Sequence, residues 1–89
     1  FCDKLFLGVD GFDLDFGIST PSPEEAYLNQ IMIDISKEVI VLADSSKFER
    51  RGFAFIAPVS KINIVITDKG IRPEYKSRLE ATGIKVIVV

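Results

Sequence analysis

The residues best suited to ligand chemistry stand between Val41 and Glu49, where the chain reads Val-Leu-Ala-Asp-Ser-Ser-Lys-Phe-Glu. An apolar run enters a turn that carries one carboxylate, two hydroxyls and one ammonium group, from Asp44, Ser45, Ser46 and Lys47. Polar ligands of α/β proteins bind at the carboxyl ends of strands, and hydroxyls beside a compact positive charge suit a phosphate or sugar hydroxyls. The segment therefore predicts a sugar-phosphate site. An ordinary polar turn is the alternative interpretation.

Two other loops carry groups of the same kind. Asp10, Gly11 and Asp13 place two carboxylates around a glycine, which permits a tight turn and close approach of a ligand to the backbone. Thr20 precedes a predicted helix, and hydroxyls with free amides at a helix start can hold an anion. Asp-Gly is also a common turn sequence. We expect these residues to join the Asp44–Lys47 turn at one site.

The chain of 89 residues has no histidine and a single cysteine, Cys2. Ser-His-Asp triads, Cys-His pairs and His-based metal sites are therefore excluded within it, and Cys2 has no histidine to activate it. We expect no metal and no other cofactor. A single cysteine forms no intrachain disulfide, which favours a reducing compartment, and we expect the cytoplasm.

Charge and hydropathy argue against two classes of partner. Eleven Lys and Arg against 13 Asp and Glu give a net charge of -2, whereas a nucleic-acid-binding domain is expected to be basic. The sequence contains no run of 18 apolar residues and no signal-peptide pattern. We expect neither direct DNA or RNA binding by these residues nor a membrane segment.

The apolar pattern predicts an α/β fold with a mostly parallel sheet of about four to five strands and flanking helices. Runs rich in Val and Ile, typical of strands covered on both faces, lie at residues 5–9, 39–43, 62–66 and 84–89. Helices are predicted at residues 23–37 and 73–82, and residues 53–56 are predicted to be extended. The apolar face expected for the first helix consists of Leu28, Ile31, Met32 and Ile35. Residues 1–89 are expected to be one domain or a fragment of one.

The phenylalanines are predicted to pack and not to stack on bases, because no surplus of positive charge accompanies them. Phe12 and Phe16 fall in a predicted loop. They are therefore the expected members of a subunit interface.

The order of these segments resembles a known family. The residues that carry the resemblance are Asp3 to Gly11, Gly17 to Thr20, Glu25-Ala26, Leu28-Asn29, Met32, Val41 to Phe48, Ile66 to Asp68 and Gly83 to Ile87. Over essentially the whole chain they resemble the carboxyl-terminal sensor domain of the DeoR family of bacterial transcriptional repressors. The resemblance implies a Rossmann-like fold related to ribose-5-phosphate isomerase, a homo-oligomer, and control of sugar catabolism by a phosphorylated sugar. Operator DNA would be bound only by a winged helix-turn-helix domain, which we expect to lie outside this chain together with the first part of the sensor.

The comparison with the isomerases also implies a mechanism. Residues 9–13 look like their Asp-Gly-Ala-Asp segment, and Asp44 to Lys47 look like their Asp-x-Ser-Lys turn. The alignment puts Asn29 where the isomerases keep the glutamate that moves the proton, and Thr20 where they keep a lysine. An amide cannot act as a general base, so we expect binding without turnover. Lys47 is expected to meet the phosphate or a hydroxyl, and Asp10 to accept hydrogen bonds from hydroxyls, while Thr20 and Asn29 orient the sugar.

Two alternatives remain open from the sequence. One is a sugar-phosphate isomerase or deaminase fragment with a displaced base, for which Glu24 and Glu25 are the candidates. Their place in the first turn of a helix already explains both residues. The other is an assembly module whose polar loops bind nothing.

Overall fold

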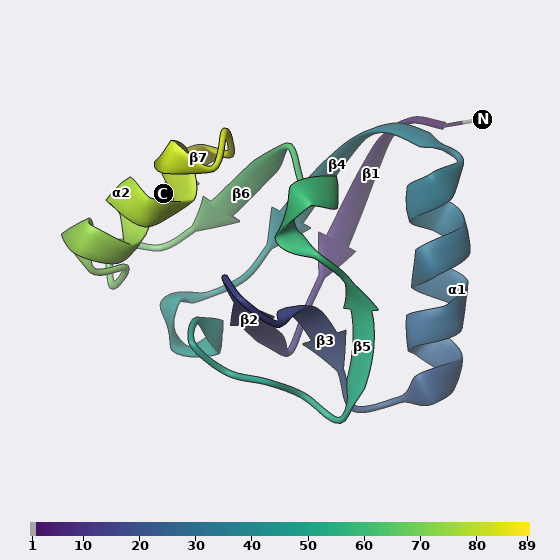
Figure 1. Ribbon diagram of the computed structural model, residues 1–89. Helices are drawn as coiled ribbons and strands as arrows, with labels where there is room; N and C mark the ends of the chain where they lie inside the picture. Colours follow the sequence, from purple (N-terminus) through teal and green to yellow (C-terminus); the bar gives the residue numbers. More distant parts are fainter. Residues whose placement is uncertain (1) are drawn as a thin grey trace.

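Two sheets and two helices make up the computed structural model, which describes residues 2–89 (Figure 1). The helices are α1 (Pro23–Asp34) and α2 (Pro73–Ala81), and single 3-10 turns form η1 (Ser45–Lys47) and η2 (Val59–Lys61). The strands are β1 (Cys2–Gly8), β2 (Gly11–Asp13), β3 (Gly17–Thr20), β4 (Ser36–Leu42), β5 (Ala54–Ala57), β6 (Ile64–Thr67) and β7 (Lys85–Val88). None of the described helices is long and apolar enough to cross a membrane.

The larger sheet has the strand order β1-β4-β6-β7, and all neighbouring strands are parallel. Its register places Val41 between Leu7 of β1 and Val65 of β6, and Val65 next to Val86 of β7. These four strands are those expected from the apolar runs, although β6 begins two residues later than predicted. The predicted α/β class with a mostly parallel sheet is confirmed.

The smaller sheet was predicted only in part. It is antiparallel with the order β2-β3-β5, and its β5 confirms the extended segment at residues 53–56. The expectation of loops at residues 11–13 and 17–20 is wrong, because these segments pair as a hairpin. Its turn is stabilised by Asp13, whose Oδ1 accepts hydrogen bonds of 2.8 Å from the amides of Asp15 and Phe16. Strands of three or four residues are too short to show a clear periodicity.

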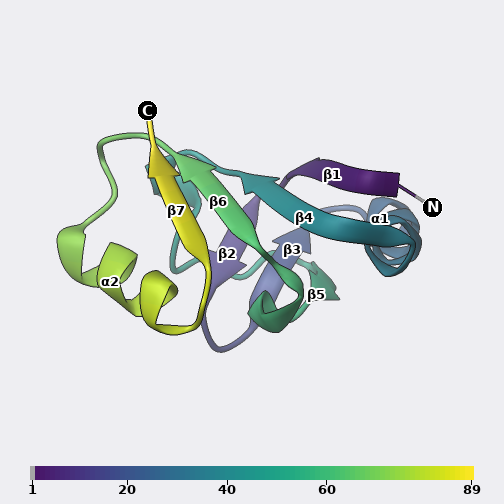
Figure 2. The ribbon, with the colours of Figure 1, turned by 90° about the horizontal axis from the view of Figure 1, so that it is seen from above.

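The core lies on one side of the parallel sheet. Figure 2 shows the smaller sheet below the parallel strands, α1 under β1 and α2 beside β7, with no helix or strand above them. Leu7, Val41 and Val65 point into this core, while Phe6 and Leu42 are exposed on the opposite face, with Ile66 half-buried there. Within the described residues no helix covers that opposite face, although Ile40 is buried there. The strands are therefore covered by other elements on one face, not on both as expected.

Helix α1 buries a different face from the one predicted. Ala26 and Ile33 are buried against the rest of the core, whereas Leu28, Ile31 and Ile35 are exposed. Apolar residues recur at helical spacing on two stripes of α1, and this spacing alone does not show which stripe faces the core. The helix also ends at Asp34 and not at residue 37, because Ser36 begins β4.

Phe12 and Phe16 occupy different environments from the loop predicted for them. Phe12 is fully buried in β2, so the expectation that it belongs to a subunit interface is wrong. Phe16 is half-buried and packs edge to face on Phe55, with a centroid distance of 5.5 Å, while the Arg51 guanidinium lies over its ring.

Candidate functional site

Three polar loops leave the parallel sheet at the same edge. Asp10 follows β1, Asp44 follows β4 and Asp68 follows β6, and these strands run parallel with Gly8 opposite Leu42 and Leu42 opposite Ile66. The structure therefore places Asp10 and Asp44, which the sequence analysis selected, at the same edge as Asp68. This edge is where α/β sheets bind ligands.

The Asp44–Lys47 turn is held by its own carboxylate. Asp44 caps η1, and its Oδ1 accepts hydrogen bonds from the Ser46 hydroxyl and, at 3.0 Å, from the Ser46 amide. The Ser46 hydroxyl, followed by the amide, holds the pKa of Asp44 below its ordinary value. Asp44 and Ser46 are exposed, and Lys47 is half-buried at the end of η1. The turn therefore presents an ionised carboxylate that can accept hydrogen bonds from ligand hydroxyls.

Asp68 joins the loop after β6 to this turn. Its Oδ2 accepts a hydrogen bond of 3.0 Å from the Ser45 amide, and its Oδ1 accepts one of 2.8 Å from the Gly70 amide. These two amides lower the pKa of Asp68. Gly70 lies so close to the turn that a Cβ at this position would meet the Ser45 hydroxyl oxygen. The two strand-end loops therefore form one hydrogen-bonded unit.

On the open face of the sheet, this unit borders a hollow of about 330 Å³. Its polar residues are Asp44, Thr67 and Asp68, and Leu42 and Ile66 form much of its apolar wall. The Thr67 hydroxyl is buried and has no hydrogen-bond partner among the described residues. Because side chains alternate along a strand, the Thr67 hydroxyl lies on the core side with Val65, away from this open face.

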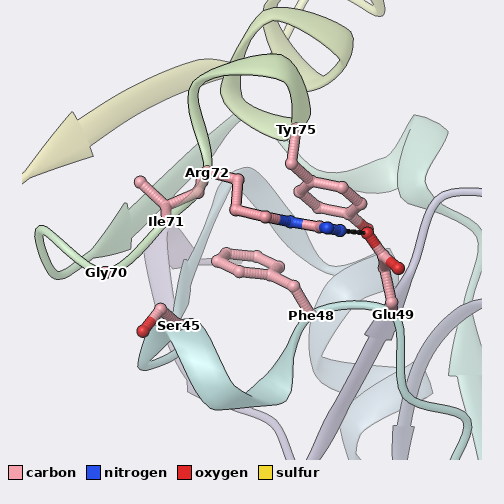
Figure 3. Close-up of a pocket in the computed structure, with 7 residues that line it drawn as sticks. All are labelled: Ser45, Phe48, Glu49, Gly70, Ile71, Arg72 and Tyr75. Carbon is pink, nitrogen blue, oxygen red and sulfur yellow. Dashed lines mark hydrogen bonds and ion pairs between the residues drawn. The ribbon is translucent and has the colours of Figure 1, made fainter.

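On the core side, the same unit borders a second cavity of about 200 Å³ between η1 and the start of α2 (Figure 3). Figure 3 shows the Arg72 side chain running beside the rings of Phe48 and Tyr75 to the Glu49 carboxylate, with which it forms an ion pair. The two ring centroids are 5.1 Å apart. Burial raises the pKa of Tyr75 to about 12, helped by the charges of Asp13 and Glu49, so the phenol stays a neutral donor.

Of the residues that line this second cavity, the sequence analysis selected Ser45 but neither Arg72 nor Tyr75. Tyr75 falls within the helix predicted at residues 73–82, and Arg72 directly precedes that helix. A cation in the loop after a predicted strand is the signal that would have identified Arg72. No local pattern identifies Tyr75, because its place depends on how α2 packs against Phe48.

Gly11 and Asp13 serve the hairpin in this structure. Gly11 is buried, and a Cβ there would meet the Ser19 hydroxyl oxygen and lie 2.8 Å from the Arg50 carbonyl oxygen. The close backbone approach that glycine allows here is therefore made by Ser19 and Arg50, and not by a ligand. Asp13 stabilises the turn before β3 and forms an ion pair of 3.3 Å with Arg51. Amide hydrogen bonds from Phe16 and Asp15, together with Arg51, lower its pKa despite partial desolvation.

Thr20 and Asn29 lie on the elements that join the smaller sheet to α1. Thr20 is buried, and its hydroxyl donates a hydrogen bond of 3.0 Å to Glu25 Oε2. Asn29 is half-buried on the stripe of α1 that also carries Ala26 and Ile33, so it faces the smaller sheet. Neither residue is hydrogen-bonded to the Asp44–Lys47 turn among the described residues. No group of three possible metal ligands is present in residues 2–89.

Comparison with known proteins agrees with this architecture. The model of the DeoR C-terminal sensor domain matches residues 2–69. The chain belongs to this family of sensor domains. The chain is 41% identical, over 98% of its length, to a candidate transcriptional repressor of the aga operon in Escherichia coli O157:H7. The match covers 32% of that protein. The chain is 33% identical over 96% of its length to the regulator GlpR of Haloferax volcanii, also covering about a third (33%) of that protein.

A third relative is the repressor GlcR of Bacillus subtilis, to which the sensor chain is 31% identical over 97% of its length. These relatives are named as helix-turn-helix regulators or repressors of transcription. The sensor chain spans about a third of the length of the curated relatives it matches. The predicted resemblance to the DeoR C-terminal sensor domain is thereby confirmed.

Proposed function

We propose that this sensor chain detects the effector of a bacterial transcriptional repressor of sugar catabolism by binding a phosphorylated sugar without converting it. The observation that supports this proposal most directly is the single hydrogen-bonded unit formed by the Asp44–Lys47 turn and Asp68. This unit combines fixed carboxylates, hydroxyls and an ammonium group at the edge where α/β sheets bind ligands. Effector binding would shift the equilibrium between DNA-binding and non-binding arrangements of the regulator.

The residues take different parts in this proposal. Asp10 and Asp44 accept hydrogen bonds from sugar hydroxyls, and Lys47 contacts the phosphate or a hydroxyl. Ser45 and Ser46 supply further hydroxyls, although the Ser46 hydroxyl is already bonded to Asp44. Gly11 and Asp13 support the hairpin behind the site. Thr20 and Asn29 are proposed to orient the sugar, which requires the Thr20 hydroxyl to exchange its bond with Glu25.

Binding without turnover is the second part of the proposal. It is supported by the amide at Asn29, which cannot take a proton from a carbon as a carboxylate does. Glu25 is the carboxylate nearest in sequence, and it accepts a hydrogen bond from Thr20 at the start of α1. The relatives named as transcriptional regulators also support a sensor rather than an enzyme.

The test uses the full-length regulator and a panel of triose, pentose and hexose phosphates, each paired with its unphosphorylated sugar. Calorimetry should detect binding of at least one phosphorylated member and not of its partner sugar. The same ligand should release operator DNA in a gel-shift assay. Chromatography of the mixture after a long incubation should recover the sugar phosphate unchanged. Isomerised product at a rate above that of the buffer would contradict the proposed absence of turnover.

We also propose that the full-length regulator is a cytoplasmic homo-oligomer. The large apolar side chains exposed on α1 and on the open face of the sheet support burial against further protein. Light scattering on the full-length protein, with and without effector, measures the number of subunits. A monomer at all concentrations would contradict this part of the proposal.

A further inference from the structure

The cavity on the core side of the Asp44–Lys47 turn has the chemistry of an anion site. It is lined by one cation, Arg72, by the hydroxyl-bearing Ser45 and by the rings of Phe48 and Tyr75. Its volume of about 200 Å³ is below the roughly 300–1,000 Å³ of pockets that enclose a whole small molecule. The cavity therefore has room for the anionic end of a larger ligand.

Arg72 is the residue that can bind such an anion. Its side chain is 61% exposed, and it stands directly before Pro73 at the start of α2. Its guanidinium offers a planar fork of donors, which matches the oxygens of a phosphate or carboxylate in a bidentate arrangement. The side chain of Arg72 makes no capping hydrogen bond to α2, so the helix does not require it.

Glu49 is the ion-pair partner of Arg72 in this structure. Its carboxylate forms an ion pair with the guanidinium, and its side chain is 50% exposed. An ion pair this exposed is weak, and a phosphate with two negative charges competes with it effectively. Glu49 is also the one non-glycine residue with a positive φ, 61°, in the described part of the chain. A side chain held at an unfavourable backbone angle is consistent with a special task at this position.

Tyr75 adds a second, independent indication of a ligand. Its hydroxyl is buried beside the backbone amides of Glu49 and Leu14, and no acceptor for its hydrogen atom is present among the described residues. Burial keeps this phenol protonated, so it can donate a hydrogen bond but carries no charge that would repel an anion. A ligand or a rearranged Glu49 would satisfy this donor.

We propose that the cavity between η1 and α2 binds the phosphate of the effector through Arg72, and that Glu49 is an internal competitor which the phosphate displaces. This inference rests on the proposed function, because it assigns the anionic end of the same ligand. The sugar then extends past Ser45 toward the carboxylates of Asp44 and Asp68. The released Glu49 lies in the chain between η1 and β5, and its amide donates a hydrogen bond to the Phe12 carbonyl of the hairpin. Ligand binding therefore changes the contacts of both the turn and the hairpin.

The experiment measures binding of inorganic phosphate to the full-length regulator by ³¹P NMR titration. Arg72→Gln should weaken phosphate binding about tenfold or more, because a charged hydrogen-bonded pair is lost. Glu49→Gln should strengthen it about two- to fivefold, because the competing carboxylate is removed. Arg78→Gln is the matched control. It removes the same charge from α2, and its guanidinium lies 5.8 Å from the Tyr75 ring centroid. The hollow beside Arg78 shares Glu49 and Tyr75 with the cavity but does not include Arg72 or Ser45.

The outcomes separate this site from the proposed function. Phosphate binding that is absent from the unmodified protein, unchanged in Arg72→Gln, weakened in Glu49→Gln or lost equally in Arg78→Gln overturns the assignment. Sugar-phosphate binding that survives Arg72→Gln unchanged contradicts the site and leaves the proposed function intact. Phosphate binding through Arg72 without binding of any sugar phosphate contradicts the proposed function and leaves the site. Circular dichroism melting of each variant confirms that it is folded.

Discussion

The rings of Phe12 and Phe48 meet edge to face, with their centroids 5.2 Å apart and their planes at 79°. Phe12 belongs to β2, and Phe48 directly follows the Asp44–Lys47 turn. A backbone hydrogen bond joins the same two segments, because the Phe12 carbonyl accepts a hydrogen bond of 2.7 Å from the Glu49 amide. The hairpin therefore fixes the position of the polar turn from behind. Through these two contacts a buried aromatic residue supports the exposed Asp44–Lys47 turn.

Replacement of Phe12 by alanine should destabilise the sensor and disturb the turn. The ring is fully buried, and loss of a buried phenylalanine costs about 3–5 kcal/mol. Chemical denaturation of the full-length regulator measures this change in the free energy of unfolding. Phe53→Ala is the control, because Phe53 is 83% exposed and its loss should change stability by less than about 0.5 kcal/mol. Equal effects of the two substitutions would show that Phe12 does not support the core.

Gly11→Ala should destabilise the hairpin for a steric reason. The new methyl group would meet the Ser19 hydroxyl oxygen and lie 2.8 Å from the Arg50 carbonyl oxygen, and overpacking of this kind costs about 1–3 kcal/mol. The Ser19 hydroxyl also accepts a hydrogen bond of 2.6 Å from the Gly52 amide, which the shift would strain. Thermal melting gives the comparison with Gly8→Ala, where a Cβ would find no atom within 4 Å. A Gly11→Ala protein with the same melting temperature as the wild type would refute the tight contact at Gly11.

The sequence predicts the parallel sheet well because its four apolar runs are strong and local. The hairpin is different, since β2 and β3 contain only three and four residues and pair mainly with each other and with β5. Helix α1 shows a second limit. The exposed stripe with Leu28 and Ile31 is more apolar than the buried stripe with Ala26 and Ile33, so hydropathy points to the wrong face. Only the packing against β3 and β5 decides which stripe is buried.

The candidate site likewise contains some residues that the sequence predicts and others that it does not. Asp10, Asp44 and Asp68 were predictable because each follows a strand, and parallel strands bring their ends to one edge. Arg72 and Tyr75 meet Phe48 and Glu49 only because α2 returns to the core side of the sheet, which no local pattern specifies. Thr20 illustrates the opposite case. Its hydroxyl was selected as a ligand group, and the structure bonds it to Glu25.

The Ser46 hydroxyl should control the ionisation of Asp44. It is the main cause of the lowered pKa of this carboxyl, so Ser46→Ala should raise the pKa toward the ordinary value of 3.8. A carboxyl with a depressed folded-state pKa stabilises the fold above its unfolded pKa, and this contribution is lost as the pH falls through the folded-state pKa. The turn should therefore loosen below pH 3.8 in the wild type, and at a higher pH in Ser46→Ala. Carboxyl ¹³C NMR titration measures the pKa directly. An identical Asp44 titration in both proteins would contradict the assignment.

Lys47→Ala should weaken effector binding and leave operator binding intact. Lys47 ends the η1 turn beside two carboxylate-bearing loops, and removal of a charged hydrogen-bond donor costs about 1.5–3 kcal/mol of binding, or roughly ten- to hundredfold in affinity. Lys61→Ala is the matched control, because Lys61 is an exposed lysine that ends the other 3-10 turn, η2, before β6 begins. Gel shifts with operator DNA and increasing effector distinguish the two variants. Release of the operator by Lys47→Ala at the wild-type effector concentration would make Lys47 a surface charge, and equal losses in both variants would point to a general effect of charge.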